Sequence, residues 1–250
     1  MVANHLQQKD LFMRSVLCPF FALAFLVFAG TATAQDGYKY IAQSFDGIGK
    51  SYMGREIASV MSHQGAPWLE RPQREQQERT DKLIELLNLK PTDYVADIGA
   101  GSGYFAFRMG KLVPKGFVFA VDIQAEMLGL IEDRIANGEG DNVIPVHSST
   151  ASPKLKENTI DLMLLVDAYH EFSLPREMGI GMYRSLKPGG RIVLVEYRAE
   201  DPSVPIKTLH KMTEAQAKLE MAAVGFEWVS TDSTSLPWQH LMIFRKPSAK

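Results

Sequence analysis

Short apolar runs alternate with stretches of helical periodicity over most of the chain. Runs of strand length fall at residues 94–98, 117–121, 143–147, 160–166 and 191–197. Between the second and third runs, Met127, Leu128, Ile131 and Ile135 recur at the spacing of one helix face. The fourth run is apolar almost throughout, as in a strand that is buried on both faces. This alternation predicts a parallel sheet covered by helices on both sides.

The two ends of this pattern differ from its middle. The apolar stripe after Pro72 predicts a helix that ends near Leu89, and Thr213 with Gln216 forms a capping box for a late helix. The final runs, 227–231 and 241–244, have no helix between them, so the last strand is expected to be antiparallel. The segment 35–72 is expected to be irregular, with one short helix near residues 54–61.

The N-terminus has the layout of a secretory signal. A polar start with Lys9 and Arg14 precedes the apolar run 16–30, and the small residues 32–34 follow it. The run is short for a membrane span. We therefore expect residues 1–34 to be a cleaved signal peptide of an exported protein, periplasmic or secreted. The alternative is an uncleaved segment that anchors the chain to a membrane, the only membrane contact we expect.

Composition excludes some classes of partner. The chain has 250 residues, of which 46% are hydrophobic, and a formal net charge of −2. Such a chain has no strong field for nucleic acids or anionic membranes. The single cysteine, Cys18, lies in the N-terminal segment, so a mature chain would have no disulfide or thiolate metal site. The histidines have no metal-ligand spacing along the sequence, and no metal is expected.

A glycine-rich loop follows the first predicted strand, in the stretch VADIGAGSGYF. Gly99, Gly101 and Gly103 permit a sharp turn and close approach of a ligand to the main chain, ahead of a helix N-terminus. Asp122, at the end of the next strand, is placed to accept hydrogen bonds from ribose hydroxyls. The alternatives are a plain tight turn and a helix N-cap. Tyr104 stands where the dinucleotide fingerprint needs its third glycine, which disfavours a dehydrogenase.

Four motifs in order resemble those of class I S-adenosylmethionine-dependent methyltransferases: VADIGAGSGYF, VFAVDIQAEML, IDLMLLVDAYHEF and SLKPGGRIVLVEY. The resemblance covers about residues 73–246 and is greatest to the small-molecule branch of the quinone-biosynthesis type. It implies an α/β, Rossmann-like, doubly wound sheet of seven strands in the order 3-2-1-4-5-7-6, with the last strand antiparallel and helices on both faces. It also implies a methyltransferase domain at 73–250, preceded by an N-terminal extension or lid at 35–72.

The same resemblance implies S-adenosylmethionine as cofactor and a set of residues around it: Asp97, Gly99, Ala100, Gly101, Gly103, Asp122, Ile123, Met127, Ser148 and Asp167. The glycine loop would hold the methionine portion, with Asp97 near its amino group. Asp122 would bind the ribose, and Ile123 and Met127 would flank the adenine. The family often has an acid after the third strand, whereas this chain has HSSTASP, so Ser148, Ser149 or the backbone would serve there.

Residues after the fourth strand would face the transferred methyl group in this fold: Asp167, Tyr169, His170 and Glu171. His170 has a pKa suited to a general base, or else is a structural histidine at a helix start. Glu171 suits a helix N-terminus, and Tyr169 would form a wall of the pocket. Enzymes that methylate exocyclic nitrogens typically have prolines here, and this chain has none, so nucleic-acid bases are not expected as acceptors.

Weaker candidates lie outside these motifs. Trp68 and Arg71, in the extension, would contact substrate or the cofactor carboxylate, or else be a packed and a solvated side chain. Arg198, His210 and Lys211 follow the fifth strand. The sequence thus predicts methyl transfer to a small or apolar molecule, with an oxygen or carbon acceptor favoured. The alternative is an exported, non-catalytic domain that binds a nucleoside or adenosylmethionine.

Overall fold

The computed structural model describes residues 37–248. The predicted signal peptide, with Cys18 and the predicted cleavage site, lies outside this range. Within it, the helices all fall short of the length and apolar character that a membrane span requires.

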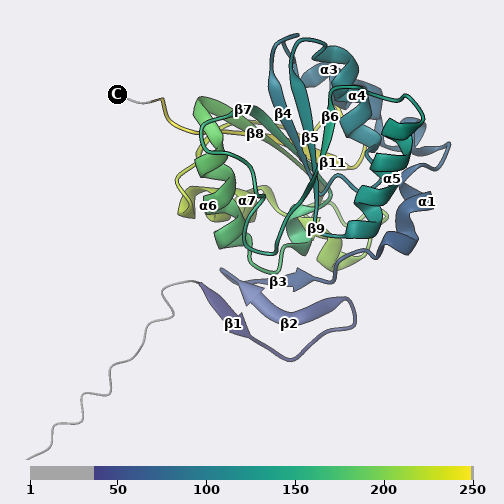
Figure 1. Cartoon of the computed structure of the whole chain (residues 1–250). Coiled ribbons are helices and arrows are strands. Elements are labelled where there is room, and N and C mark those ends of the chain that lie inside the picture. Colours follow the sequence, from purple (N-terminus) through teal and green to yellow (C-terminus); the bar gives the residue numbers. More distant parts are fainter. Residues whose placement is uncertain (1–36, 249–250) are drawn as a thin grey trace, which may run out of the picture. The chain divides into compact units, whose positions relative to one another are not determined.

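A mostly parallel sheet forms the centre of the molecule (Figure 1). Its strands are ordered β6-β5-β4-β7-β8-β11-β10, and the two-residue β9 pairs with β8. β11 runs antiparallel to β8, whereas β6, β5, β4, β7 and β8 are parallel. In order of sequence this is 3-2-1-4-5-7-6, which confirms the predicted topology. The bounds are β4 Tyr94–Ile98, β5 Phe117–Asp122, β6 Val143–His147, β7 Ile160–Val166, β8 Leu186–Arg198, β9 Lys211–Met212, β10 Glu227–Asp232 and β11 Gln239–Arg245.

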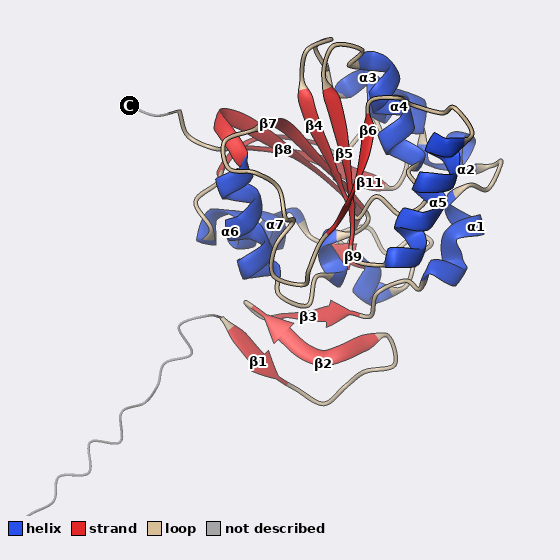
Figure 2. Ribbon diagram, in the orientation of Figure 1, coloured by secondary structure: helices blue, strands red, loops and turns tan. Residues whose placement is uncertain are grey.

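Helices cover both faces of this sheet, as predicted (Figure 2). Within β4, Val95 packs into the core on the first face, and Ala96 and Ile98 pack into the core on the second. This two-residue alternation is the strand period that the sequence pattern displays. The first face is covered by α3 Thr80–Leu86, α4 Tyr104–Leu112 and α5 Ala125–Ala136, and the second by α6 Pro175–Ser185 and α7 Glu214–Ala223.

Two predicted helix boundaries are informative. The expected helix after Pro72 is two helices, α2 Arg74–Glu78 and α3, because Arg79 between them has φ of 53° and breaks the helical path. One half of the predicted capping box of α7 is confirmed, since the Thr213 side chain accepts from the Gln216 N–H, whereas the Gln216 side chain donates to the Met53 carbonyl and to Glu220.

The N-terminal segment contains a second, antiparallel sheet of three strands, β1 Tyr38–Tyr40, β2 Gly47–Tyr52 and β3 Arg55–Ala58. The predicted helix at residues 54–61 is therefore wrong. Met53 and Gly54, with φ of 48° and 95°, form a two-residue connection between β2 and β3. Positive φ at both central residues is the geometry of a tight hairpin. The segment continues as the short helices η1 His63–Gly65 and α1 Ala66–Leu69.

A buried ion pair joins this second sheet to the main domain. Arg55 on β3 donates from Nε and a terminal nitrogen to both carboxylate oxygens of Glu220 on α7, at 2.7 and 3.0 Å. Its other terminal nitrogen donates to the His170 carbonyl at 3.0 Å. The Glu220 side chain is fully buried and the Arg55 side chain is 10% exposed. Loss of either partner would leave an uncompensated buried charge.

We expect Arg55→Met to lower the free energy of unfolding by about 3–5 kcal/mol, because Glu220 would remain charged and buried. The double variant Arg55→Met with Glu220→Met should recover most of that loss. Lys82→Ala, which removes an exposed ion pair with Glu85, is the control and should change stability by less than about 1 kcal/mol. Urea denaturation measures all three, and a single variant as mild as the control would contradict the assignment.

Candidate active site

A cavity of about 390 Å³ lies at the carboxyl ends of the central strands. This edge of an open α/β sheet is where such folds bind ligands. Its lining residues from the strand ends and following loops include Ile98, Gly99, Gly101, Asp122, Ile123, Met127, Ser148, Ser149, Asp167, His170, Glu171, Lys207 and His210. The N-terminal segment adds Val60, Met61, Trp68, Leu69 and Arg74. The cavity thus has one wall from the main domain and one from the segment predicted to cover it.

The glycine loop turns as the sequence predicts. The N–H groups of Gly99 and Ala100 both donate to the Val121 carbonyl, at 2.8 and 3.0 Å. Gly99 has φ of 79°, and a Cβ there would lie 2.7 Å from the Cβ of Ala168. Because a side chain at this position meets both backbone strain and a clash, glycine is required for the loop to pass the end of β7.

The other loop residues divide into two kinds. Gly101, like Gly99, lines the cavity, and a Cβ on it would come within 2.6 Å of Leu69. Ala100 and Gly103 do not line the cavity: Ala100 is buried in the core and Gly103, with φ of 80°, begins α4. The structure therefore places Gly99 and Gly101 in the cavity wall and gives Ala100 and Gly103 a role in shaping the loop.

The Asp122 carboxylate lies in the cavity wall beside this loop. One oxygen accepts from the Gly101 N–H at 2.8 Å and the other from the Gln124 N–H at 2.9 Å. Burial raises the pKa of Asp122, although these hydrogen bonds oppose the shift. Each carboxylate oxygen has a second acceptor site. The fixed carboxylate can therefore receive two further donors from the cavity, as a ribose would supply.

The predicted adenine neighbours gather around Asp122. Ile123, Met127, Ser148 and Ser149 all line the cavity. Ser148 is held next to Asp122 because its N–H donates to the Asp122 carbonyl at 2.9 Å. Contact of these four residues with an adenine ring stays a prediction.

Asp97 lies behind the loop and does not line the cavity. Its Oδ2 is buried and has no hydrogen-bond partner among residues 37–248. Burial raises the pKa of Asp97 to about 7. Contact between this carboxyl and the amino group of a cofactor stays a prediction.

The turn η2 Tyr169–Glu171 follows β7 and is fixed by Glu196 on β8. One oxygen of Glu196 accepts from the Tyr169 and His170 N–H groups at 2.9 and 3.3 Å, and the other lies 2.6 Å from Nδ1 of His170. Burial opposes a charge on His170, but attraction and hydrogen bonding to Glu196 outweigh it, so the pKa of His170 is raised. With Nδ1 held in this way, Nε2 of His170 is left for other partners.

Tyr169 was predicted to form a wall of the pocket near the transferred methyl group, and this prediction is wrong. Its side chain is 1% exposed, packs in the core of the second face and does not line the cavity. The Arg55 guanidinium lies 5.8 Å from the centre of its ring. Neighbouring residues in a tight turn point in different directions, so with His170 at the cavity Tyr169 turns toward α7.

Asp167, the first residue after β7, lines the cavity in an unusual conformation. Its φ is 50°, a region that a non-glycine residue seldom adopts. Oδ2 accepts from the Gln239 amide at 3.3 Å, whereas Oδ1 is buried without a partner among the described residues. Burial, with the nearby charges of Glu78 and Glu196, raises the pKa of Asp167 well above its usual range. A buried acceptor at a cavity wall suits a donor from a ligand.

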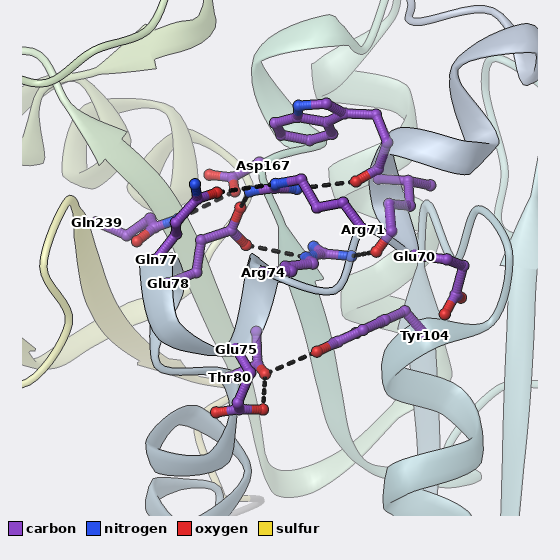
Figure 3. Close-up of polar contacts among 12 residues, drawn as sticks. Glu70, Arg71, Arg74, Glu75, Gln77, Glu78, Thr80, Tyr104, Asp167 and Gln239 are labelled. Atoms are coloured by element: carbon purple, nitrogen blue, oxygen red, sulfur yellow. Dashed lines mark hydrogen bonds and ion pairs between the residues drawn. The ribbon is translucent and has the colours of Figure 1, made fainter.

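Arg74, and not the predicted Arg71, reaches the cavity, and both arginines contact Glu78 (Figure 3). Arg71 lies 3.9 Å from the centre of the Trp68 ring and pairs with Glu78, and it is not among the lining residues. Arg74 lines the cavity instead, pairs with Glu78 at 3.0 Å and donates to the Leu69 carbonyl at 2.9 Å. Trp68 lines the cavity as predicted.

Of the candidates after β8, only His210 lines the cavity, where Lys207 joins it. Arg198 donates to backbone carbonyls, including that of Pro237 at 2.6 Å, and Lys211 lies outside the lining set. Glu196 was not predicted as a site residue, although a single acid in the apolar run RIVLVEY indicates a buried carboxylate with a specific partner.

The residues 61–63 cross the cavity between its two ends. The Met61 N–H donates to the Glu171 carboxylate at 3.2 Å. The side-chain amide of Gln124, two residues after Asp122, donates to the Met61 carbonyl at 3.0 Å and accepts from the His63 N–H at 2.8 Å. The segment is therefore hydrogen-bonded both to the glycine-loop end and to the His170 end.

Comparison with known proteins agrees with this geometry. Residues 95–190 match the family model described as a methyltransferase domain. A ubiquinone/menaquinone biosynthesis C-methyltransferase of Pseudomonas savastanoi pv. phaseolicola is 30% identical over 155 residues, 61% of this chain and 58% of the relative. An uncharacterized methyltransferase-like protein of Schizosaccharomyces pombe is 29% identical over 60% of this chain and 56% of the relative. The chain thus spans about half the length of the curated relatives that it matches.

The fold has solved counterparts. A SAM-dependent methyltransferase from Aquifex aeolicus superposes with a TM-score of 0.69 at 21% identity, over 74% of this chain and 99% of the other. Residues 95–190 are thus similar in sequence to methyltransferase domains, and the chain has the fold of a solved SAM-dependent methyltransferase.

Proposed function

We propose that this protein transfers a methyl group from S-adenosylmethionine to an oxygen or carbon atom of a small or apolar molecule. The observation that carries the proposal is the continuity of the cavity. Gly99, Gly101 and Asp122 line it at one end and His170 lines it at the other. A cofactor on the glycine loop would direct its methyl group toward the residues that follow β7.

The walls of the cavity favour a small acceptor with apolar surface. Besides the residues that follow β4 and β5, its apolar lining includes Val60, Met61, Trp68, Leu69, Phe172, Met178 and Ile206. The sulfonium methyl group is intrinsically reactive, so much of the catalysis consists of holding an acceptor in line with it. Walls contributed by the N-terminal segment would orient the acceptor and exclude water. The match to a C-methyltransferase of quinone biosynthesis supports an aromatic or quinol-like acceptor.

An oxygen or acidic carbon acceptor must lose a proton during transfer, and His170 is the group we assign to that step. Its side chain is 2% exposed, Glu196 holds Nδ1 at 2.6 Å, and Nε2 lies 3.0 Å from Nδ1 of His210, which lines the same cavity. A carboxylate that orients an imidazole toward a reacting group is the arrangement of many base catalysts. The alternative function, a non-catalytic domain that binds adenosylmethionine, requires cofactor binding without product formation.

Asp122→Ala should weaken S-adenosylmethionine binding by at least about tenfold, because two hydrogen bonds to a carboxylate are lost at about 1.5–3 kcal/mol each. Isothermal titration calorimetry measures the affinity. Glu132→Ala, which removes an exposed acid of α5 outside the cavity, should bind as the wild type does. An unchanged affinity in Asp122→Ala would show that the ribose lies elsewhere.

Wild-type protein should release S-adenosylhomocysteine when it is given S-adenosylmethionine and a panel of phenols and quinols. His170→Ala should slow this release by about 10²–10⁴-fold and leave cofactor affinity nearly unchanged. His147→Ala, which removes an exposed histidine, is the control. Cofactor binding without release from any acceptor would support the non-catalytic alternative, and a His170→Ala variant with full turnover would make that histidine structural.

We also propose that the chain is exported, from the polar start, apolar run and Ala-Thr-Ala sequence of residues 1–34. The mature chain should begin at Gln35. N-terminal sequencing of the protein from the exported fraction measures this. An intact chain found in the cytosol would contradict both the signal peptide and the localisation.

A further inference from the structure

Three side chains at the acceptor end of the cavity direct metal-ligating atoms toward one another. They are His170 and Glu171, on the turn after β7, and His210, at the end of the short helix η3 Thr208–His210 after β8. Their ligating atoms all lie within 4.8 Å of each other. The two histidines are 40 positions apart in the sequence, so their spacing gave no indication of a site.

The distances fit a single ion. Nε2 of His170 lies 3.0 Å from Nδ1 of His210, and Oε1 of Glu171 lies 3.8 and 3.5 Å from these nitrogens. Atoms that coordinate one ion at about 2.0–2.2 Å in tetrahedral or octahedral geometry are about 3.0–3.6 Å apart. The three atoms therefore need to move by only a few tenths of an ångström to share an ion.

Outer contacts already orient two of the three ligands. Glu196, which is fully buried, holds Nδ1 of His170 at 2.6 Å and so presents Nε2 to the cluster. A carboxylate behind a histidine is the usual outer partner in metal sites, where it fixes the ring and increases its basicity. The Met61 N–H holds Glu171 at 3.2 Å. Two of the three candidate ligands are therefore held in place before any ion binds.

The charges near the cluster favour a cation. Glu171 and Glu196 both contact the imidazole of His170, and their side chains are only 14% and 0% exposed. A guanidinium of Arg55 lies on the other side, bonded to the His170 carbonyl and paired to Glu220. The two carboxylates bring negative charge that a divalent ion bound by the imidazoles would offset.

We propose that His170, Glu171 and His210 bind one divalent transition-metal ion, and that this ion coordinates an oxygen atom of the methyl acceptor. Two imidazoles and one carboxylate suit zinc, manganese, cobalt or ferrous iron, and three protein ligands leave positions open toward the cavity. The proposal of a metal site does not depend on methyl transfer. The proposal that the ion activates the acceptor rests on the proposed function.

Such an ion would act as a Lewis acid that activates a hydroxyl group of the acceptor. Coordination to the ion would lower the pKa of the acceptor O–H, and its proton would pass to water. The oxygen lone pair would form the new C–O bond as the C–S bond of the sulfonium breaks, and sulfur would keep the electron pair of that bond. In this inference His170 would be a ligand, which replaces the base role assigned to it under the proposed function, and an oxygen acceptor is favoured over carbon.

Metal binding is measured directly on protein without a histidine tag and without cofactor or acceptor, by titration with zinc, manganese and cobalt chlorides and by elemental analysis. We expect one ion per chain and, for cobalt, visible absorption typical of nitrogen and oxygen ligands. His210→Asn and Glu171→Gln should each weaken binding by at least about 100-fold, and Glu196→Gln by about 10–100-fold. His147→Ala is the matched control and should bind as the wild type does.

The outcomes separate the two proposals. Circular dichroism and cofactor affinity like those of the wild type show that a variant is folded, and Glu171→Gln keeps the shape and the acceptor for the Met61 N–H. No saturable binding by wild type, or binding that His210→Asn and Glu171→Gln leave unchanged, overturns the metal site. Methyl transfer that persists at full rate after chelation overturns the metal's role in activation and leaves the proposed function intact. Metal binding without any methyl transfer overturns the proposed function and leaves the metal site intact.

Discussion

The Glu196 carboxylate organises the site more than any other group. It is fully buried on β8, and a buried charge is tolerable only when it is fully hydrogen-bonded. The parallel register of β7 with β8 pairs Val166 with Val195, so the chain that leaves β7 passes directly beside Glu196. Two N–H groups and one imidazole from that chain satisfy the carboxylate. The direction of His170 into the cavity follows from the need to pair this one charge.

A second buried charge pair acts on the same turn from the opposite side. Arg55, from the N-terminal sheet, binds Glu220 on α7 and the carbonyl of His170. The turn after β7 is thus fixed by the backbone contacts of Glu196 and by the guanidinium of Arg55. The N-terminal sheet therefore helps to hold the turn after β7 in place. Its removal would take Arg55 away from both Glu220 and the His170 carbonyl.

The central domain was predictable because its pattern is repeated and local. Each strand is an apolar run, each helix has one apolar face, and the order of the strands followed from the family resemblance together with the missing helix between the last two runs. The glycine loop and Asp122 were found for the same reason, since close backbone approach and a strand-end acid are local requirements. The N-terminal sheet was missed because the Met53–Gly54 hairpin has no strong turn signal and its strands are short.

The acceptor end was predictable only in part, because its geometry depends on contacts between distant residues. The sequence placed His170 after the fourth strand, but its partner Glu196 is 26 positions away. Arg74 reaches the cavity and Arg71 does not, although both pair with Glu78, and helical periodicity does not distinguish them. Tyr169 shows the same limit, since residue spacing cannot decide which of two neighbours in a tight turn faces the core.

The hydrogen bonds of residues 61–63 have a consequence for the exchange of ligands. The Gln124 side-chain amide bonds to the Met61 carbonyl and the His63 N–H, and the Glu171 carboxylate accepts from the Met61 N–H. Each such hydrogen bond contributes only about 0.5–1.5 kcal/mol, so opening this segment would cost far less than unfolding the sheet behind it. Under the proposed function, one opening would uncover both the cofactor end and the acceptor end of the cavity. Spent cofactor and methylated product would then leave by one exit, and a lingering adenosylhomocysteine would delay the entry of the next acceptor.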